Sequence, residues 1–558
     1  MDKEDFIHDE SVDVAGLYTG DALLNNAKIA SDKEHELGFR QAMKIYPQAV
    51  FWSFILSLTI VMEGYDTSLM SNFYTYPAFA AKYGTYFDST TNSMQISGPW
   101  QTALGDATEI GTFFGALLNG YFCERFGHRK ILCTSLFFLA AFIFIIFFSP
   151  SVQVLLVGQI LVGFPLGVFA TVGPAYASEV CPLALRGYLT AYINLCWSIG
   201  QLISAGVLQG MKNVDSKWSY RVPQAIQWVW PLPIFILVFI APESPWWLVR
   251  RGRLVDAERS VKRLSSKNAL ATPREMIAMM IHTTKLEQQL QSNDSYIQCF
   301  KGIDLRRTEI ACMVLVGQVM CGGPFAYSPT YFFVQAGLSS DNSYKVNLGA
   351  TALGFVGTVL SWFLLPKMGR RTIYTWGMAT MCFLLFLVGF LSLAPDTNQS
   401  ALWAAAAMTV IWHLVYSLTI GPIGWTIASE ISATRLRQQT VCVARVAYYL
   451  INIIAGVVEP QLINVTENNW KGKTAFFWAG SALIHTCWCV FRLPEAKDRT
   501  YEELDIMFER RVPAMKFRKY EVNAFEDQNA INAAMTTTSG PETGEATVEQ
   551  REAEEKTK

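Results

Sequence analysis

The chain has 558 residues, of which 51% are hydrophobic and only 16% are charged, and its formal net charge at pH 7 is −1. Soluble proteins carry about 25% charged residues, so this composition excludes an ordinary soluble globular protein. The near-zero net charge gives no indication of a nucleic-acid partner, and the 11 cysteines, none in a Cys-x-x-Cys pair, predict neither a disulfide framework nor a zinc site.

Residues 1–48 are polar and contain no signal-peptide pattern, so we expect a disordered segment before the first apolar run. Twelve apolar segments follow, each near the ~20 residues that a helix needs to cross a bilayer. We predict spans at 50–72, 101–123, 131–149, 152–175, 187–209, 224–241, 309–333, 346–365, 373–394, 401–425, 439–462 and 473–492. The second span is interrupted by Asp106 and Glu109. The sequence therefore predicts an all-α membrane protein with twelve transmembrane helices.

Lysine and arginine are concentrated in the loops on the side of the two termini, which places that side in the cytosol. The short loops agree with this orientation through Arg125, Arg129, Lys130, Lys367, Arg370, Arg371, Arg435 and Arg437. We divide the chain into a cytosolic N-terminal segment (1–48), a six-helix half (49–241), a cytosolic helical linker (242–308), a second six-helix half (309–493) and a mostly disordered cytosolic tail (494–558).

Three N-glycosylation sequons provide a check on this topology. Those at Asn398 and Asn464 fall in loops assigned to the outside, where they are accessible to modification. The third, at Asn293, falls in the cytosolic linker, where we expect it to stay unmodified.

An internal repeat relates the two halves. The corresponding segments are 124–130 with 366–371, 177–187 with 428–437, and Pro242-Glu243 with Pro494-Glu495. The three pairs occur in the same order and roughly 240 to 250 residues apart, as two parallel six-helix halves require. Chance similarity of short basic loops is the alternative for any single pair.

Several motifs resemble those of the sugar-porter branch of the major facilitator superfamily, over roughly residues 45–510. They are Gly64-Tyr65-Asp66-Thr67, 124–130, 174–187, 242–248, Gly421-Pro422 with Trp425 and Glu430, and Pro494-Glu495 with Arg499-Thr500. Within that branch the chain is most similar to fungal maltose and other α-glucoside permeases, through 63–67, 175–186 and the doubled tryptophan Trp246-Trp247. The resemblance implies a major facilitator fold with two pseudo-symmetric six-helix halves, and sugar transport by alternating access.

Acidic and basic residues recur at the cytosolic helix ends of both halves. Ion pairs between these helix ends would hold the inward side closed and break when it opens, and the resemblance implies such a gate. The residues we assign to it are Glu124, Arg125, Arg129, Glu179, Arg186, Arg370, Glu430 and Arg437. The alternative is that these charges only fix the topology and solvate the loops.

Charged residues inside predicted spans are notable, because a charge at the bilayer centre costs about 2.5 to 3.5 kcal/mol on insertion scales. Glu63 and Asp66 lie three residues apart and share a helix face, Glu109 lies in the second span and Arg445 in the eleventh. Neighbouring carboxylates in a poorly solvated site raise each other's affinity for protons. We therefore assign these four residues to proton coupling. A structural ion pair with Arg445, or a position nearer the membrane surface, is the alternative.

The sequence departs from part of the family at one position. Many proton-coupled sugar porters have an arginine after the glycine that matches Gly158, where it answers the first-span aspartate; this chain has Gln159. Arg445 is an alternative counter-charge for Asp66. Uncoupled facilitation therefore stays open.

A sugar requires neutral polar groups for its hydroxyls and aromatic faces for its C–H surfaces. By correspondence with the family, and by their shared helix faces, the expected substrate contacts are Asn194, Gln201, Gln318, Trp425, Tyr448, Tyr449 and Asn452. Asn194 replaces a family glutamine and Pro324 replaces a family asparagine, which favours a different or larger sugar than a monosaccharide. The alternative is that these polar side chains only join helices.

These observations predict a plasma-membrane sugar transporter that works as a monomer, carrying an α-glucoside such as maltose together with protons, with no cofactor and no metal. An enzyme would need a catalytic constellation or a cofactor loop, and the sequence contains neither. An uncoupled sugar facilitator and a non-transporting sugar sensor remain as alternatives.

Overall fold

The computed structural model describes residues 26–27, 29–30, 33, 37–74, 76–88, 93–211, 214, 216–266, 269, 271–290, 296–327, 340–365, 367–394, 399–432, 436–463, 468, 470–497, 499 and 501–520. Within this part of the chain, each of the twelve predicted spans contains a helix, which confirms the helical membrane fold. The sequon asparagines Asn293, Asn398 and Asn464 lie outside the described residues.

The first half contains the helices that precede residue 241. They are α4 (Pro47–Ser57) with α5 (Thr59–Phe73), α7 (Gly98–Phe126), α8 (His128–Phe147), α9 (Val152–Val180), α10 (Leu183–Met211), and α11 (Trp218–Ile226), which continues through a 3-10 turn (Gln227–Val229) into α12 (Pro231–Ile240). Most of these helices extend several residues beyond the predicted spans, and the first and sixth spans are interrupted.

The second half repeats this arrangement. Its helices are α16 (Gly302–Met320) with α17 (Gly323–Tyr327), α19 (Ser340–Leu364), α20 (Arg370–Leu391), α21 (Gln399–Leu418) with α22 (Ile420–Ile431), α23 (Arg437–Ile463) and α24 (Thr474–Arg492). The predicted tenth span is broken at Thr419, whose backbone leaves the helical region. Among the described residues, ten helical segments are long and apolar enough to cross a membrane by length and composition alone. The more polar α7 and α10 have 29 residues each, which is about 43 Å of helix and enough to span.

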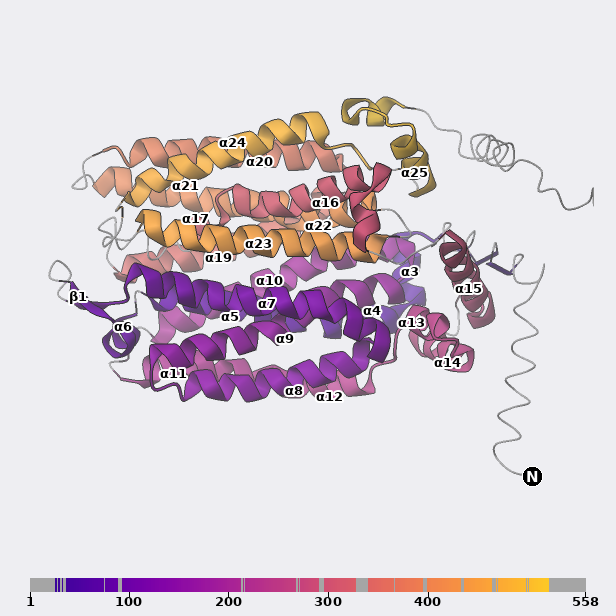
Figure 1. Cartoon of the computed structure of the whole chain (residues 1–558), viewed down its shortest axis with the longest axis horizontal. Coiled ribbons are helices and arrows are strands. Elements are labelled where there is room, and N and C mark those ends of the chain that lie inside the picture. Colours follow the sequence, from indigo (N-terminus) through magenta and orange to yellow (C-terminus); the bar gives the residue numbers. More distant parts are fainter. Residues whose placement is uncertain are drawn as a thin grey trace, which may run out of the picture.

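Each half has its own hydrophobic core. One buried cluster includes Leu132, Phe169 and Val238 of the first half, and another includes Val314, Met378 and Trp478 of the second. Figure 1 shows the two halves as two layers of helices that run along the same long axis. The layers meet through α7 and α10 of the first half and α19 and α23 of the second. Large hydrophobic side chains such as Phe137 and Phe383 are exposed on the outside of the bundle, where a bilayer would cover them.

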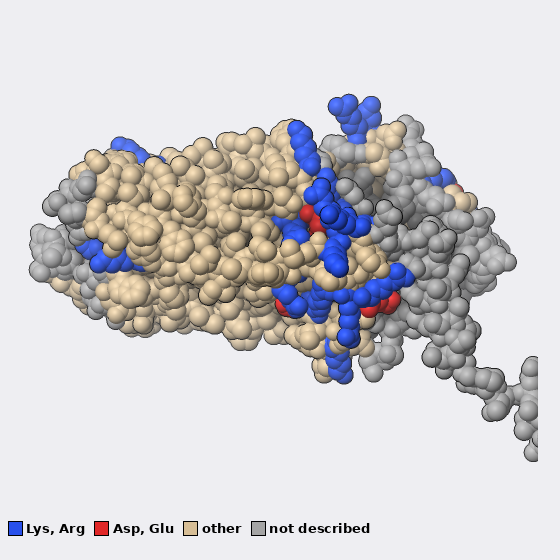
Figure 2. All heavy atoms as spheres, turned by 90° about the horizontal axis from the view of Figure 1, so that it is seen from above, with Lys and Arg blue, Asp and Glu red and all other residues tan. Residues whose placement is uncertain are grey.

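The two ends of the bundle differ. One end, which we call the linker face, carries α3 (Phe39–Ile45), α13 (Pro245–Arg250), α14 (Leu254–Leu264), α15 (Pro273–Leu290) and α25 (Tyr501–Glu509). The other, the hairpin face, carries α6 (Pro77–Tyr83) and the antiparallel strands β1 (Tyr86–Asp88) and β2 (Ser93–Gln95). Lysine and arginine gather at the linker face, while the long middle of the body is almost free of charge on the side seen in Figure 2.

Two segments expected to be disordered contain regular structure. Helix α3 lies within the N-terminal segment, where Ser266 of the linker donates its backbone N–H to the Ile45 carbonyl at 2.9 Å. In the tail, α25 and a 3-10 helix (Ala514–Lys519) bury Phe508 and Phe517 against the second half. The remainder of the tail, from residue 521, lies outside the described residues.

Glycines let α7 and α9 approach closely. A Cβ atom at Gly111 would lie 2.1 Å from the Ile160 carbonyl oxygen, and one at Gly163 would lie 2.3 Å from that of Thr108. Such small-residue contacts are how membrane helices pack tightly, since lipid provides no hydrophobic driving force between them. The contact fixes the position of α7, which carries Glu109 towards the other half.

Candidate functional site

An ion pair crosses the contact between the two halves. The Glu63 carboxylate of α5 lies 3.9 Å from the Arg445 guanidinium of α23, and the two residues are only 8% and 7% exposed. The guanidinium also faces three aromatic rings, with its carbon 4.0 Å from the centroid of Trp425, 5.0 Å from Tyr449 and 5.4 Å from Tyr448. The buried charge of Arg445 is therefore stabilised by one carboxylate and by aromatic faces from its own half.

Glu109 joins this group from α7. Its carboxylate interacts with the Asn452 amide and with Arg445, both on α23. Arg445 and Asn452 are seven residues apart, so they lie on one face of that helix. Five residues from four helices form a cluster with Tyr448 and Tyr449 at the interface of the halves: Glu63, Glu109, Trp425, Arg445 and Asn452.

Asp66 has a different partner from the one considered from the sequence. Arg445 pairs with Glu63, whereas the Gln227 amide donates a hydrogen bond of 2.8 Å to Oδ1 of Asp66. Asp66 is 3% exposed, and its Oδ2 has no hydrogen-bond partner in the described structure. Gln227 lies in the 3-10 turn between α11 and α12, and its polar side chain near the start of the sixth predicted span was the available signal for it.

Gln159 stands in place of the family arginine, and its neutral side chain provides no counter-charge for Asp66. Its side-chain oxygen accepts a hydrogen bond of 2.8 Å from the Thr108 hydroxyl of α7, and the residue is buried. The position therefore joins α9 to α7 by a neutral contact.

A second group of polar side chains lies where α10 meets α19 and α22. Asn194 lies 3.5 Å from the Thr358 hydroxyl, and Gln318 donates its amide N–H to the Gly421 carbonyl at 3.1 Å. A Cβ at Gly421 would lie 3.3 Å from the Asn194 amide nitrogen, so Asn194 and Gln318 approach the start of α22 from opposite halves. Gln201 is also buried on α10, about two turns further towards the hairpin face.

The halves also meet near the hairpin face, through residues that the sequence did not indicate. The Tyr344 hydroxyl donates to the Asn72 carbonyl at 2.8 Å, and the Asn347 amide donates to Oδ1 of Asn72 at 3.3 Å. The Tyr344 ring packs edge-on against Tyr76, with centroids 5.9 Å apart. These contacts join α5 to α19 and close the bundle at this point.

At the linker face, two of the three predicted gate glutamates, Glu179 and Glu430, each pair with an arginine. Glu430 lies 3.2 Å from Arg370 of α20, and Glu179 lies 2.5 Å from Arg250 of α13. Glu179 also accepts a hydrogen bond from the Ser244 hydroxyl, and the His128 imidazole lies 3.9 Å away. Burial opposes ionisation of Glu179, but Arg250, His128 and Ser244 together outweigh it and hold its pKa below the ordinary value.

The other predicted gate residues are placed differently. The Arg129 guanidinium donates to the Ala241 carbonyl, Arg125 donates to the Tyr121 hydroxyl, and the Glu124 side chain is exposed while its carbonyl accepts from Trp247 and Arg251. The side chains of Arg186 and Arg437 lie outside the described residues.

Two further glutamates at this face hold the first turns of helices. Glu243 accepts hydrogen bonds from the backbone N–H groups of His128 and Arg129 at the start of α8, and Glu495 accepts one of 2.8 Å from that of Arg370 at the start of α20. Both are anions at a helix N-terminus, where the helix dipole favours negative charge. The repeated Pro-Glu pairs in the sequence were the signal for these residues.

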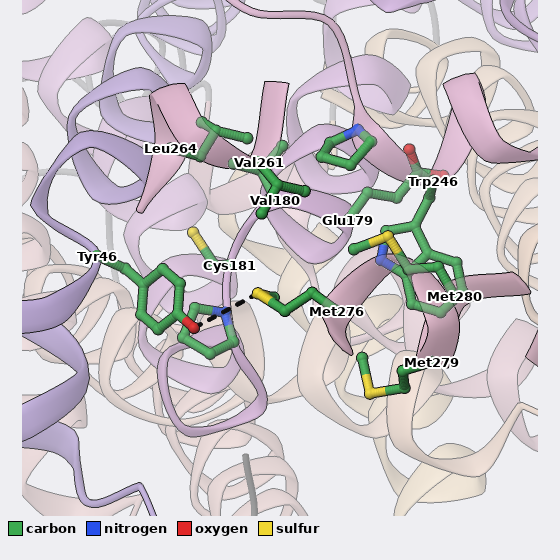
Figure 3. Close-up of a pocket in the computed structure, with 12 residues that line it drawn as sticks. Tyr46, Glu179, Val180, Cys181, Trp246, Val261, Leu264, Met276, Met279 and Met280 are labelled. Atoms are coloured by element: carbon green, nitrogen blue, oxygen red, sulfur yellow. Dashed lines mark hydrogen bonds between the residues drawn. The ribbon is translucent and has the colours of Figure 1, made fainter. Parts of the chain in front are cut away.

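A small cavity also lies at the linker face, between the end of α9 and helices α13 to α15 (Figure 3). Its volume is about 30 Å³, and Tyr46, Glu179, Met276 and Met280 are among its lining residues. The Tyr46 hydroxyl lies 3.6 Å from the Met276 sulfur. A space of this size holds about one water molecule, so it is no sugar site.

Comparison with known proteins agrees with this architecture. The family model described as "Sugar (and other) transporter" matches residues 52–508. A maltose permease of Saccharomyces cerevisiae is 39% identical over 522 residues, which cover 92% of this chain and 84% of the permease. The general alpha-glucoside permease of that yeast is 36% identical, covering 90% of this chain and 82% of its own. These relatives are permeases and not enzymes.

Solved structures show the same fold at lower sequence identity. A major facilitator superfamily proton:xylose symporter, bound to 6-bromo-6-deoxy-D-glucose, superposes with a TM-score of 0.68 at 20% identity, covering 83% of this chain and 99% of that one. The xylose transporter from E. coli in a partially occluded inward-open conformation gives a TM-score of 0.66, covering 81% and 100%. The chain thus has the major facilitator fold, and it belongs to the sugar transporter family.

Proposed function

We propose that this sugar transporter is a proton symporter for an α-glucoside such as maltose, which works by alternating access as a monomer in the plasma membrane. The observation that carries the proposal is the group formed by buried Glu63 and Arg445 with half-buried Glu109 at the interface of the halves. Buried charges in a membrane protein are costly and therefore mark ion pathways. The names of the yeast relatives support maltose and related α-glucosides as the substrate class.

The ion pair between Glu63 and Arg445 provides a way to link a proton to a conformational change. A proton on the Glu63 carboxyl oxygen removes its charge and therefore its attraction for Arg445, which remains between aromatic rings. Because the pair joins α5 to α23, its strength differs between states in which these helices are close and states in which they are apart. Proton binding therefore shifts the balance between such states.

We place the sugar between the same two halves. Asn194 and Gln318 already approach each other at the start of α22, and Gln201 extends the polar surface of α10. Trp425 and Tyr448 supply aromatic faces for the C–H surface of a pyranose ring, while amides bind its hydroxyls. The contact of Tyr344 with Asn72 closes one end of this region, and sugar entry from that end requires it to open.

We assign the linker face to the cytosol and the hairpin face to the outside. The gathering of lysine and arginine at the linker face supports this orientation (Figure 2). The pairs Glu179–Arg250 and Arg370–Glu430 then belong to a cytosolic gate, each bracing one half on that side.

Uncoupled facilitation is the second candidate, and one observation favours it. The partner of Asp66 is the neutral amide of Gln227, and Gln159 is neutral as well. Proton release from Asp66 would therefore lack the positive neighbour that an arginine provides in related symporters.

The test is sugar uptake with simultaneous recording of external pH, in cells that lack other sugar transporters. Maltose, trehalose, sucrose and glucose are offered in turn to wild type, Asp66→Asn and the control Asp256→Asn, which removes an exposed carboxylate of the linker. A symporter gives uptake of a disaccharide with alkalinisation of the medium, which Asp66→Asn loses and Asp256→Asn keeps. Uptake without any pH change would support the facilitator instead.

A further inference from the structure

We infer that Asp106 is the outer proton-accepting residue, which receives a proton from the outside and passes it to Glu109. This inference rests on the proposed symport and on the proposed orientation. Asp106 lies on α7, one turn closer to the hairpin face than Glu109, and the two carboxylates share a helix face because they are three residues apart.

Asp106 is a buried carboxylate without a counter-charge. It is 6% exposed, and in the described structure no hydrogen bond or ion pair holds its side chain. The titratable groups that face it are Glu109 on its own helix and the Tyr74 hydroxyl at the end of α5. That hydroxyl donates its hydrogen bond to the Gln101 carbonyl at 3.0 Å. A structural carboxylate would be expected to have a partner, because burying an unpaired charge is costly.

A glycine of the opposite half makes room for this carboxylate. A Cβ at Gly456 of α23 would lie 1.9 Å from Oδ1 of Asp106, so any larger residue there would displace it. Asn452, one turn from Gly456, interacts with Glu109. Two successive carboxylates of α7 therefore face two successive turns of α23, and no titratable group of α23 intervenes at Gly456.

The arrangement connects Asp106, on the side of the hairpin face, with Glu109 beside the central ion pair. Residues three apart on a helix differ in height by about 4.5 Å, which a carboxyl side chain can bridge by a change of rotamer or through one water molecule. In the transfer, the O–H bond at Asp106 breaks as one forms at a Glu109 oxygen, and Asp106 regains its negative charge. Two neighbouring carboxylates in a poorly solvated site are both ionised only at high cost, so a single proton shared between them is favoured.

The experiment measures uptake of the transported disaccharide over a range of external pH, for wild type and Asp106→Asn. The asparagine amide is close in size to the aspartic carboxyl group, but it does not bind a proton in this range of pH. We expect the external pH for half-maximal uptake to move about one unit towards acid, so that net uptake near pH 7 falls about tenfold. Exchange of labelled for unlabelled sugar needs no net proton movement, and we expect it to stay at the wild-type rate.

Glu459→Gln is the matched control. Glu459 is likewise buried near the hairpin-face end of α23, but its carboxylate accepts a hydrogen bond of 2.5 Å from the Trp478 indole of α24. The same change from carboxyl to amide there leaves the path along α7 intact, so the external pH profile should stay that of wild type.

A second variant keeps the inference testable if Asp106→Asn does not reach the membrane. Gly456→Ala displaces the Asp106 carboxylate and should give the same acid shift, whereas in an Asp106→Ala background it should add none. A wild-type pH profile in Asp106→Asn, in protein that couples sugar to protons, would overturn the role of Asp106 and leave symport standing. A wild type that moves no protons with sugar would overturn both proposals.

Discussion

The Arg445 guanidinium of α23 lies 3.9 Å from the Glu63 carboxylate of α5, so a buried ion pair connects two helices that belong to different halves. Both groups have lost almost all contact with solvent, and each would be a costly isolated charge without the other. The pair therefore stabilises the contact of the halves only while both charges are present.

Removing one partner of this pair should destabilise the protein more than removing both. Glu63→Gln leaves the Arg445 charge buried without its nearest carboxylate, and we expect a loss of about 3–5 kcal/mol in the free energy of unfolding. In the double variant Glu63→Gln/Arg445→Gln both charges of the pair are gone and Glu109 keeps its hydrogen bond with Asn452, so the loss should be smaller than the sum of the single losses. Thermal unfolding of the purified protein in detergent measures both.

The control for this cycle is an ion pair on the surface. Lys262 and Glu258 lie 2.8 Å apart on the exposed helix α14, and Lys262→Gln should change stability by less than about 1 kcal/mol. Strictly additive losses at Glu63 and Arg445 would contradict an energetic link between them.

Gly163 should not tolerate alanine. The added methyl group would meet the Thr108 carbonyl at 2.3 Å, which forces α7 and α9 apart and should cost about 1–3 kcal/mol. Gly206→Ala is the matched control, since a Cβ there has no neighbour within 4 Å. We expect a lower unfolding temperature for the first variant and no loss for the second. An unchanged unfolding temperature in Gly163→Ala would contradict the close helix contact.

The sequence predicted the membrane helices well, because apolarity over some twenty residues is a local property that a bilayer requires. It also identified Glu63, Asp66, Glu109 and Arg445 as candidates for proton coupling, because a charge in an apolar span is visible in the sequence without knowledge of its neighbours. It could not predict which of these charges pair. Whether Arg445 reaches Glu63 or Asp66 depends on how helices from different halves are rotated against each other, and spacing within one helix carries no information about that.

The neutral contacts were hidden for the same reason. Gln227 donates a hydrogen bond to Asp66 from a position 161 residues away in sequence, and Tyr344 donates one to the Asn72 carbonyl from 272 residues away. The sequence around Gly456 also gives no sign of its role, because only the fold places this glycine against Asp106. Motifs that recur in both halves were more informative, because Glu243 and Glu495 perform the same local task at equivalent helix starts.

Gly369 and Glu495 should act as one unit at the start of α20. A Cβ at Gly369 would lie 2.1 Å from Oε2 of Glu495, so Gly369→Ala should displace the carboxylate that accepts the Arg370 backbone N–H. We expect Gly369→Ala and Glu495→Ala each to cost about 1–2 kcal/mol, and the double variant to cost little more than either alone. Hydrogen exchange of the first-turn amides of α20 measures the loss.

The matched substitution for that unit is Gly38→Ala, since no atom lies within 4 Å of a Cβ at Gly38 and it should leave exchange in α20 unchanged. Independent, additive losses at Gly369 and Glu495 would show that the glycine serves another purpose.

The stabilisation from Glu179 should depend on pH in a definite direction. Its folded-state pKa is lower than the ordinary value of 4.5, because Arg250, His128 and Ser244 favour the charged form despite burial. A carboxyl group with a lowered pKa stabilises the folded state above its unfolded-state pKa, and this stabilisation is lost as pH falls through the folded-state value. Glu179→Gln should therefore cost about 1–3 kcal/mol at pH 7, and this difference from wild type should shrink as pH falls below 4.5 and disappear once pH is below the lowered folded-state pKa.

Thermal unfolding of wild type and Glu179→Gln between pH 3 and 8, compared pairwise at each pH, separates this effect from the titration of other carboxyl groups. Arg250→Gln provides a second test. It removes the group that most strongly favours the charged form of Glu179, so the titration of Glu179 should move to higher pH. If the stability difference between wild type and Glu179→Gln were the same at pH 3 and pH 7, the Glu179 charge would not stabilise the contact of α9 with α13. The packing of the side chain would then account for the whole effect.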